Sequence, residues 1–226
     1  METKNKKMKT AKSAKISFDS ARLTKALLAE VSDRAREVLT LRFGLDGDGE
    51  RETLEAIGER WNITRERVRQ IESSGIEAVR GSKAFKNAEG AFSELQKHVE
   101  SLGAIVPEDS LLAGLSNDPK AQNRFRFLLV VGSAFFRERE TNEFFARWHV
   151  DHSVAEKVHK ALTSLYSGLS DDEVVTEGEL FDRFLTELKD INEAYQNEEI
   201  LKRWLTLSKN IAANPLSEWG RAHAPA

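Results

Sequence analysis

The sequence predicts a mainly α-helical protein with a helix-turn-helix in its N-terminal third, followed by helices that alternate with short strands. The chain has 226 residues, of which 40% are hydrophobic and 31% are charged, enough for one large core or two to three small ones. Between Thr53 and Glu72, apolar residues recur at helical spacing on both sides of a short polar turn. Beyond residue 82, longer helical stretches alternate with short apolar segments.

Charge is distributed unevenly along the chain. The formal net charge is -3 at pH 7, yet residues 1–15 carry six lysines against one glutamate. Residues 16–82 carry eleven basic and thirteen acidic side chains, and the remainder carries seventeen and twenty-three. Because an acidic surface repels phosphates, we expect nucleic-acid binding only in the N-terminal third, through arginines gathered on one face.

Several classes of protein are disfavoured by what the sequence lacks. The absence of cysteine excludes disulfides, thiolate metal sites and a cysteine nucleophile, and it fits a reducing cytoplasm. There is no apolar run of transmembrane length and no secretory leader. No phosphate-binding glycine loop and no set of nucleophile, base and orienting group is visible. We therefore expect a cytoplasmic protein that is not an enzyme, needs no cofactor and does not contact membranes.

The first expected segment is a disordered basic tail over residues 1–16. It is rich in lysine and nearly free of large apolar side chains, so it cannot offset the entropy of ordering. Two interpretations stay open for it, a solvated terminus and a tail that attracts phosphates without sequence preference.

The second segment, residues 17–82, begins with helical spacing. Ala35–Phe43 places Val38 and Leu41 on one face, and Gly44 is a natural helix stop. The acidic loop 46–50 suggests calcium, but its ligand alternation breaks at once and the closing glutamate of a calcium loop is missing. We set calcium aside.

The helix-turn-helix follows at residues 53–74. Thr53 caps a first helix whose Leu54, Ile57 and Trp61 share one face, and Ala56 and Gly58 are small enough for close packing. Asn62 and Ile63 form the turn, and Thr64 caps a second helix that turns Val68 and Ile71 towards the core.

The opposite face of this second helix gathers four polar side chains, because successive helical residues are about 100 degrees apart. They are Arg65, Glu66, Arg69 and Gln70. Arginine can bond guanine bidentately, glutamine can bond adenine, and glutamate can accept from the cytosine amino group. This face favours the reading of base edges in the major groove. The alternative is a solvated face whose charges only pair with one another.

These residues closely resemble region 4 of the primary-type sigma factors of bacteria. The resemblance covers Val31–Gly81 and is carried by Arg36–Leu45 and by Thr64–Glu72. It implies a small helical bundle that reads the minus-35 promoter element and docks on the flap of RNA polymerase. It also implies base-edge roles for Arg65, Glu66, Arg69 and Gln70, and phosphate contacts for Arg34, Arg42, Thr53, Leu54 and Arg67.

Three departures separate this chain from an ordinary sigma factor. Ser74 and Glu77 stand where the family continues its last helix with basic residues, and the inter-helix loop is acidic, so we expect weaker backbone affinity. Nothing before Phe18 resembles the region that melts the promoter. Segments 197–205 and 214–220 resemble sigma-like regulators in which a further helix-turn-helix follows, and none follows here. We expect a shortened chain or a natural variant.

Residues 83–150 and 151–226 each show the order helix, short strand, two helices and hairpin. In the first, a helix ending at Gly103 precedes Ala104–Val106, and the aromatic pairs Phe135-Phe136 and Phe144-Phe145 are expected to form the hairpin. In the second, Val174-Val175 precedes a helix capped by Thr176. This order predicts tandem degenerate winged-helix units, and the alternative is a single irregular helical domain.

Two further clusters are set aside. His149, His152 and His159 lie close in sequence, but no carboxylate motif joins them into a metal site. The stretch from Phe125 to Trp148 mixes aromatic and arginine side chains, as a second nucleic-acid surface would. Core packing is the preferred interpretation of these aromatic residues. Trp204 and Trp219 are likewise expected to be core residues or hairpin anchors.

The leading functional hypothesis is a DNA-binding transcription regulator on the nucleoid. In it, the sigma-like domain binds promoter-like duplex DNA, and the acidic winged-helix units contact protein, either RNA polymerase or another copy of the chain. The alternative is a protein-interaction module for the polymerase flap or a sigma-binding factor, with little DNA reading. A nuclease or modification-system component is the third hypothesis.

Overall fold

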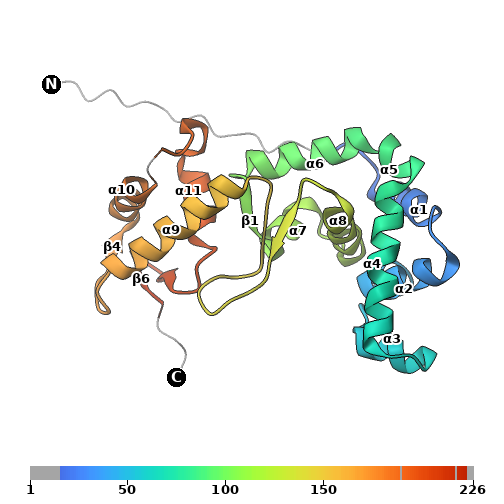
Figure 1. The fold of residues 1–226 in the computed structure, drawn as a ribbon. Helices are drawn as coiled ribbons and strands as arrows, with labels where there is room; N and C mark the ends of the chain where they lie inside the picture. Colours follow the sequence, from blue (N-terminus) through green and yellow to red (C-terminus); the bar gives the residue numbers. More distant parts are fainter. Residues whose placement is uncertain (1–15, 189, 217, 223–226) are drawn as a thin grey trace. The chain divides into compact units, whose positions relative to one another are not determined.

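The computed structural model describes residues 16–188, 190–216 and 218–222. All but the last residue of the expected basic tail therefore lies outside the described residues. Contacts divide the described chain into two compact units, which consist of residues 16–96 with 109–136 and of residues 97–108 with 137–222. Within the described ranges, none of the helices is both long and apolar enough to cross a membrane. Each unit is described by itself below (Figure 1).

The first unit opens with five helices, each begun by a side chain that accepts a hydrogen bond from an amide of the first turn. Such a cap stabilises a helix by about 0.5 to 2 kcal/mol. The helices are α1 (Ser20–Leu28), α2 (Asp33–Phe43), α3 (Leu54–Trp61), α4 (Arg65–Gly81) and α5 (Lys83–Asn87). Their caps are Asp19, Ser32, Thr53, Thr64 and Ser82. The expected caps Thr53 and Thr64 are confirmed.

Close backbone contact fixes the turn between α3 and α4. Asn62 ends α3 in the left-handed region, with φ 51°. A Cβ atom added to Gly58 would lie 2.7 Å from the carbonyl oxygen of Ile63, too close for any side chain. Gly44 ends α2 in the same left-handed conformation, with φ 60°. The helix stop expected at Gly44 and the small residue expected at Gly58 are both confirmed.

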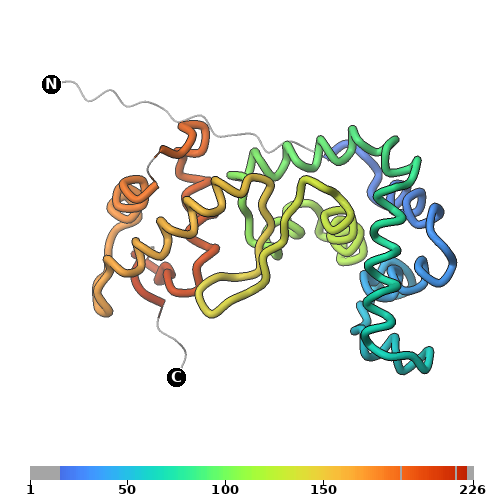
Figure 2. Tube along the Cα trace, viewed as in Figure 1, coloured from blue at the N-terminus to red at the C-terminus, as the bar shows by residue number. Residues whose placement is uncertain are grey.

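A small apolar core joins α2, α3 and α4, which lie side by side in Figure 2. Val38, Ile57 and Val68 are fully buried at its centre, one from each helix. Partly buried side chains surround them, namely Leu41, Leu54, Trp61, Ile63 and Ile71. The apolar faces expected from the helical spacing are therefore confirmed.

Helix α8 (Pro119–Val131) belongs to the same compact unit and packs against α1, α2 and α4. Buried Phe127 meets Phe43 edge to face, with 5.4 Å between ring centroids. Arg80, near the end of α4, donates to the carbonyl oxygens of Val131 and Val130 at 3.0 and 2.9 Å. The sigma-like helices thus share their core with a helix that lies outside the expected segment 17–82.

Asn123 ties α8 to the acidic loop that follows α2. Its amide nitrogen donates to the carbonyl oxygens of Gly44 and Gly49 at 3.2 and 2.8 Å. Because buried carbonyls need donors, Asn123 fixes both ends of this loop.

The remaining elements form the same order twice along the chain. The first run comprises α6 (Glu89–Ser101), β1 (Ile105–Pro107), α7 (Glu108–Leu115), α8, β2 (Phe136–Glu138) and β3 (Arg147–His149). The second comprises α9 (His152–Gly168), β4 (Val175–Thr176), α10 (Glu177–Glu187), η1 (Glu193–Tyr195), α11 (Glu198–Leu205), β5 (Ile211–Ala213) and β6 (Glu218–Arg221). The two three-stranded sheets have orders β1-β3-β2 and β4-β6-β5, so the third strand is central in both. The winged-helix assignment and the boundaries at 82/83 and 150/151 stay predictions.

The second unit has its own core, built mainly by α9, α10 and α11. Its fully buried members include Val158, Leu180, Phe184 and Trp204. The Trp204 indole donates to the carbonyl oxygen of Gly103 at 3.1 Å, which satisfies its single polar group. The expectation that Trp204 and Trp219 are core residues is confirmed.

The hairpin of the first run differs from the expected one. The strand β3 begins at Arg147, after the aromatic pair Phe144-Phe145 that was expected to form it. Trp148 pairs with Val106 across the sheet, and both are buried. Phe144 makes an isolated bridge to Ser208, and the amide of Phe145 donates to the carbonyl of Leu207 at 3.0 Å. Burial of Trp148 thus sets the register, and Phe144 and Phe145 lie in the loop between β2 and β3.

Candidate nucleic-acid interface

The four expected base-edge residues lie together in the first two turns of α4. Arg65, Glu66, Arg69 and Gln70 are all exposed, whereas Val68 between them is fully buried. The helix is fixed by Val68 on one side and by the Gly58 contact at its start. A rigid helix therefore presents these side chains on a single open face.

Within this face, Arg69 and Glu66 form a two-point ion pair. The Nε and Nη2 atoms of Arg69 donate to the two carboxylate oxygens of Glu66 at 2.8 and 2.7 Å. These hydrogen bonds from Arg69 hold the pKa of Glu66 below its usual range, and Glu66 in turn raises the pKa of Arg69. Both groups are consequently charged at neutral pH, and the Nη1 atom of Arg69 takes no part in the pair.

The other two positions have partners as well. The Nε atom of Arg65 lies 3.0 Å from a carboxylate oxygen of Glu55, in the first turn of α3. The side-chain oxygen of Gln70 accepts from Nη1 of Arg67 at 3.1 Å, and the Gln70 side chain also hydrogen-bonds Glu66, which helps to lower the pKa of that carboxyl. All of these groups are exposed, so water or a ligand can replace their partners at small cost.

The residues expected to contact phosphates differ from one another in exposure and in hydrogen-bond partners. Arg34 is exposed and lies over the ring of Trp61, with its guanidinium carbon 5.3 Å from the ring centroid. Thr53 is exposed at the start of α3, but its hydroxyl already accepts from the amide of Ala56. Leu54 is half-buried and contributes the first amide of that helix. Helix N-termini attract anions, so this position suits a phosphate.

Arg42 is more enclosed than the sequence suggests. Its side chain is 28% exposed, its Nε atom lies 3.3 Å from a carboxylate oxygen of Glu72, and Nη1 donates to the carbonyl oxygen of Glu52 at 2.5 Å. It therefore links α2, the loop before α3, and α4. Its expected phosphate contact stays a prediction.

Glutamates accompany most of the arginines around the helix-turn-helix; the sequence offered pairing within the α4 face as an alternative, but the pairs between elements were missed. Four pairs are present, Arg65 with Glu55, Arg69 with Glu66, Arg42 with Glu72, and Arg60 with Glu52. Only the Glu66–Arg69 spacing of three residues could have been anticipated from helical geometry. Ser74 and Glu77 extend the uncharged or acidic character along exposed positions of α4. The surface therefore carries weaker positive charge than its arginine content indicates.

The two clusters set aside from sequence have defined places in the structure. Phe125, Phe127 and Trp148 are buried, which confirms their assignment to cores, whereas Phe136 and Phe145 are exposed, so that assignment is wrong for these two. His149 is buried, and its Nε2 atom lies 3.4 Å from Glu138, while His159 accepts a hydrogen bond from Arg147 at 2.6 Å. Among the residues that the structure describes, no group of three or more His, Asp or Glu side chains could hold a metal ion.

Comparison with known proteins identifies the helix-turn-helix segment. Residues 27–81 match the family model described as Sigma-70, region 4. The chain is 52% identical over 54 residues to an RNA polymerase sigma factor SigA1 of Synechococcus elongatus, which covers 24% of this chain and 13% of that protein. It is 49% identical over 55 residues to RNA polymerase sigma factor RpoD of Helicobacter pylori, covering 24% of this chain and 8% of that one.

The similarity is therefore local. The chain spans less than a fifth of the length of the curated relatives it matches, and α5 to β6 lie beyond the matched segment. No solved structure matches the chain significantly. The resemblance expected from Val31–Gly81 is confirmed, and residues 27–81 form a sigma-like helix-turn-helix of the kind used in DNA-binding transcription factors.

Proposed function

We propose that this protein is a transcription regulator whose sigma-like unit reads a minus-35-type element in duplex DNA. The observation that carries the proposal is the open face of α4, where Arg65, Glu66, Arg69 and Gln70 stand together on a rigid helix. An α-helix fits the major groove, and these side-chain types match the donors and acceptors of base edges there.

Docking in this mode requires only local changes of side-chain partners. Arg69 retains the protons of Nη1 and one of Nη2 for a guanine while Glu66 holds its other edge. The side-chain amide of Gln70 becomes available to a base edge if Arg67 turns to a phosphate and Glu66 releases Gln70. The start of α3, with Arg34 beside Trp61, supplies further backbone contacts. In this proposal Arg42 contributes less, because it would have to leave Glu72 or Glu52.

The rest of the chain supports contacts with protein. Helix α8 packs against α1, α2 and α4 and so is covered by its own unit, and it is the second helix before a hairpin. Its counterpart α11 begins with Glu198 and Glu199 and packs against β1. In a winged-helix unit, the second helix before the hairpin is the one that enters the DNA groove. Neither α8, which is covered, nor α11, which begins with two glutamates, is suited to that role. The acidic units are proposed to contact RNA polymerase or another copy of the chain, on the nucleoid in the cytoplasm.

A protein-interaction module is the second candidate function. It is favoured by the four arginine–glutamate pairs and by Ser74 and Glu77, which reduce the attraction of phosphates. Under this candidate the sigma-like unit binds RNA polymerase or a sigma-binding factor, and α4 reads no bases.

Fluorescence anisotropy with variant proteins separates the two candidates. Each protein is titrated with a duplex that carries an intact minus-35 hexamer and with one in which the hexamer is scrambled. Arg69→Ala and Gln70→Ala are expected to lose about 1 to 3 kcal/mol of discrimination. Arg22→Ala is the matched control, because Arg22 is exposed on α1 and outside the α4 face. If discrimination is equal in all four proteins, the assignment of the α4 face is wrong.

A further inference from the structure

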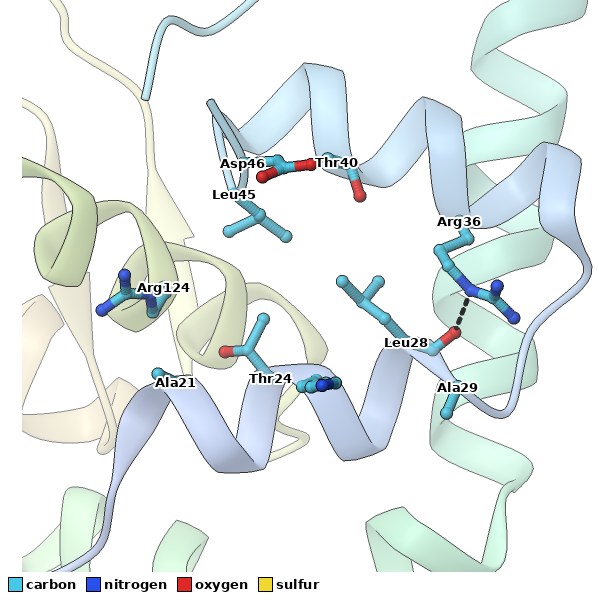
Figure 3. A pocket seen from close by; sticks show the side chains of 10 residues that line it. Ala21, Thr24, Leu28, Ala29, Arg36, Thr40, Leu45, Asp46 and Arg124 are labelled. Carbon is cyan, nitrogen blue, oxygen red and sulfur yellow. Dashed lines mark hydrogen bonds between the residues drawn. The ribbon is translucent and has the colours of Figure 1, made fainter. Parts of the chain in front are cut away.

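A cavity of about 510 Å³ lies inside the first unit, between α1, α2 and α8. Figure 3 shows Thr24 from α1, Thr40 from α2 and Arg124 from α8 around it. Small-molecule sites typically measure 300 to 1,000 Å³ and combine apolar walls with a few convergent polar groups. The volume of this cavity lies within that range, and its polar groups determine which class of ligand it can bind.

The hydroxyl of Thr24 is the first of these groups. Thr24 is only 4% exposed, yet its oxygen has no hydrogen-bond partner among the described residues. A buried polar group without a partner costs about 1 to 3 kcal/mol, and valine would fill the same space without that cost. In Figure 3 the Thr24 side chain rises from α1 between the three helices, and its hydroxyl is turned towards the side on which Arg124 lies. Packing gives no reason for a hydroxyl at this position, whereas a bound acceptor or donor would.

Two cations beside the cavity also have no partner. Lys25 follows Thr24 on α1, and Arg124 lies on α8, and in the described part of the chain neither side chain has an ion pair or hydrogen bond. Asp46 is the one acidic residue in the lining, and it accepts from the amide of Gly47 at 2.8 Å. The lining is therefore net positive, with Lys25, Arg36 and Arg124 against Asp46.

A third cation is fixed in place. The Nε atom of Arg36 donates to the carbonyl oxygen of Leu28 at 2.9 Å, and Nη2 donates to that of Val31 at 3.2 Å. Nη1 lies 3.1 Å from Asp33. Arg36 thus forms a wall of the cavity, and the remaining charge that a ligand could neutralise belongs to Lys25 and Arg124.

We propose that this cavity binds a small amphipathic carboxylate. The acid group pairs with Lys25 or Arg124 and takes a hydrogen bond from Thr24, and the apolar chain lies along Leu28 and Leu45. Such a ligand contacts α1, α2 and α8 at once. Because it binds only the folded arrangement, it stabilises the attachment of α8 to the sigma-like helices by mass action.

Isothermal titration calorimetry with straight-chain carboxylates from butanoate to decanoate tests the site. Saturable 1:1 binding of at least one member is expected, and the alcohol of the same length is expected to bind at least about tenfold more weakly because it lacks the charge. Inorganic phosphate, the other simple anion, is titrated in parallel. Absence of saturable binding by every carboxylate overturns the proposal, as does saturable binding of phosphate alone.

Variants locate the binding. Thr24→Val and the double variant Lys25→Gln with Arg124→Gln are each expected to weaken it about tenfold or more. Arg22→Gln, which removes a charge from α1 outside the cavity lining, is the matched control and is expected to leave it unchanged. Circular dichroism confirms that each variant is folded. Equal affinity in all the folded variants places the ligand elsewhere and contradicts the assignment.

Discussion

Arg69 donates two hydrogen bonds, of 2.8 and 2.7 Å, to the carboxylate of Glu66 on the exposed face of α4. Under the proposed function the pair has two opposing effects. It orients Arg69 for a base edge, and its Glu66 carboxylate repels the phosphates of the duplex. Both effects belong to exposed groups, so they are measured better by binding than by stability.

Replacing Glu66 by glutamine separates these effects. Glu66→Gln removes a charge that phosphates repel, so affinity for a scrambled duplex is expected to rise a few-fold. It also weakens the hydrogen bonds that orient Arg69 and removes a charged acceptor for cytosine. Discrimination between the intact and the scrambled hexamer is therefore expected to fall by about 1 to 3 kcal/mol. Anisotropy titrations at two salt concentrations measure both quantities. Glu59→Gln is the control, because it removes a charge at an exposed position of α3. It should leave the discrimination unchanged.

Gly58 offers a test of the turn geometry. Gly58→Ala places a Cβ atom 2.7 Å from the Ile63 carbonyl oxygen, so the start of α4 must shift. We expect a loss of about 1 to 3 kcal/mol in the free energy of unfolding, measured with urea, together with loss of hexamer discrimination. Gly90→Ala is the matched control, because a Cβ atom there meets nothing within 4 Å in α6. A neutral or stabilising Gly58→Ala would contradict the close contact.

Thr24→Val is expected to stabilise the free protein. The change removes a buried hydroxyl without a partner and keeps the shape of the side chain. The free energy of unfolding in the absence of carboxylates should rise by about 1 kcal/mol. Ser82→Ala is the contrasting variant, because its hydroxyl caps α5 and donates to Val79, and its loss should destabilise. A destabilised Thr24→Val would mean that the hydroxyl has a structural role.

The second unit should lose stability in mild acid through His159. Burial lowers the pKa of His159 from 6.5 to about 4, helped by the charge of Arg147, whose Nε–H donates to its Nε2 atom. The unfolded chain therefore takes up a proton between pH 6.5 and 4 that the folded chain does not. Stability from this group is present above pH 6.5 and falls as the pH approaches 4.

Urea unfolding at pH 7.5 and pH 5 measures this dependence. His159→Gln is expected to reduce the difference between the two pH values, by about 1 kcal/mol after allowance for solvent screening. His152→Gln, at an exposed position one residue into α9, is the control and should retain the wild-type difference. A wild-type and a His159→Gln protein with the same difference would show that His159 takes up its proton in both states.

Local signals made much of the sigma-like unit predictable. Caps such as Thr53 and Thr64, the left-handed Gly44 and the spacing of Ile57 and Val68 act within one or two helical turns. They therefore appear directly in the order of residues. The open face of α4 followed from the same geometry.

Contacts between distant residues were not predictable. Asn123 bonds Gly44 across 79 positions, and Arg42 pairs with Glu72 across 30. Helical and strand periodicity relates only residues within one element. There was therefore no sequence signal for the packing of α8 or for the enclosure of Arg42. The predicted position of the second hairpin strand was wrong for a related reason. Burial of Trp148 against Val106 outweighed the strand propensity of Phe144 and Phe145.

The most direct test of the proposed function is the ratio of two dissociation constants of the unmodified chain at about 150 mM salt, where surface charges are screened as in cells. The two ligands are duplexes with an intact and with a scrambled minus-35 hexamer. We expect the intact duplex to bind at least about tenfold more tightly, as one good base contact provides. Equal and weak binding of both duplexes, with tight binding of RNA polymerase, would contradict DNA reading and establish the protein-interaction module.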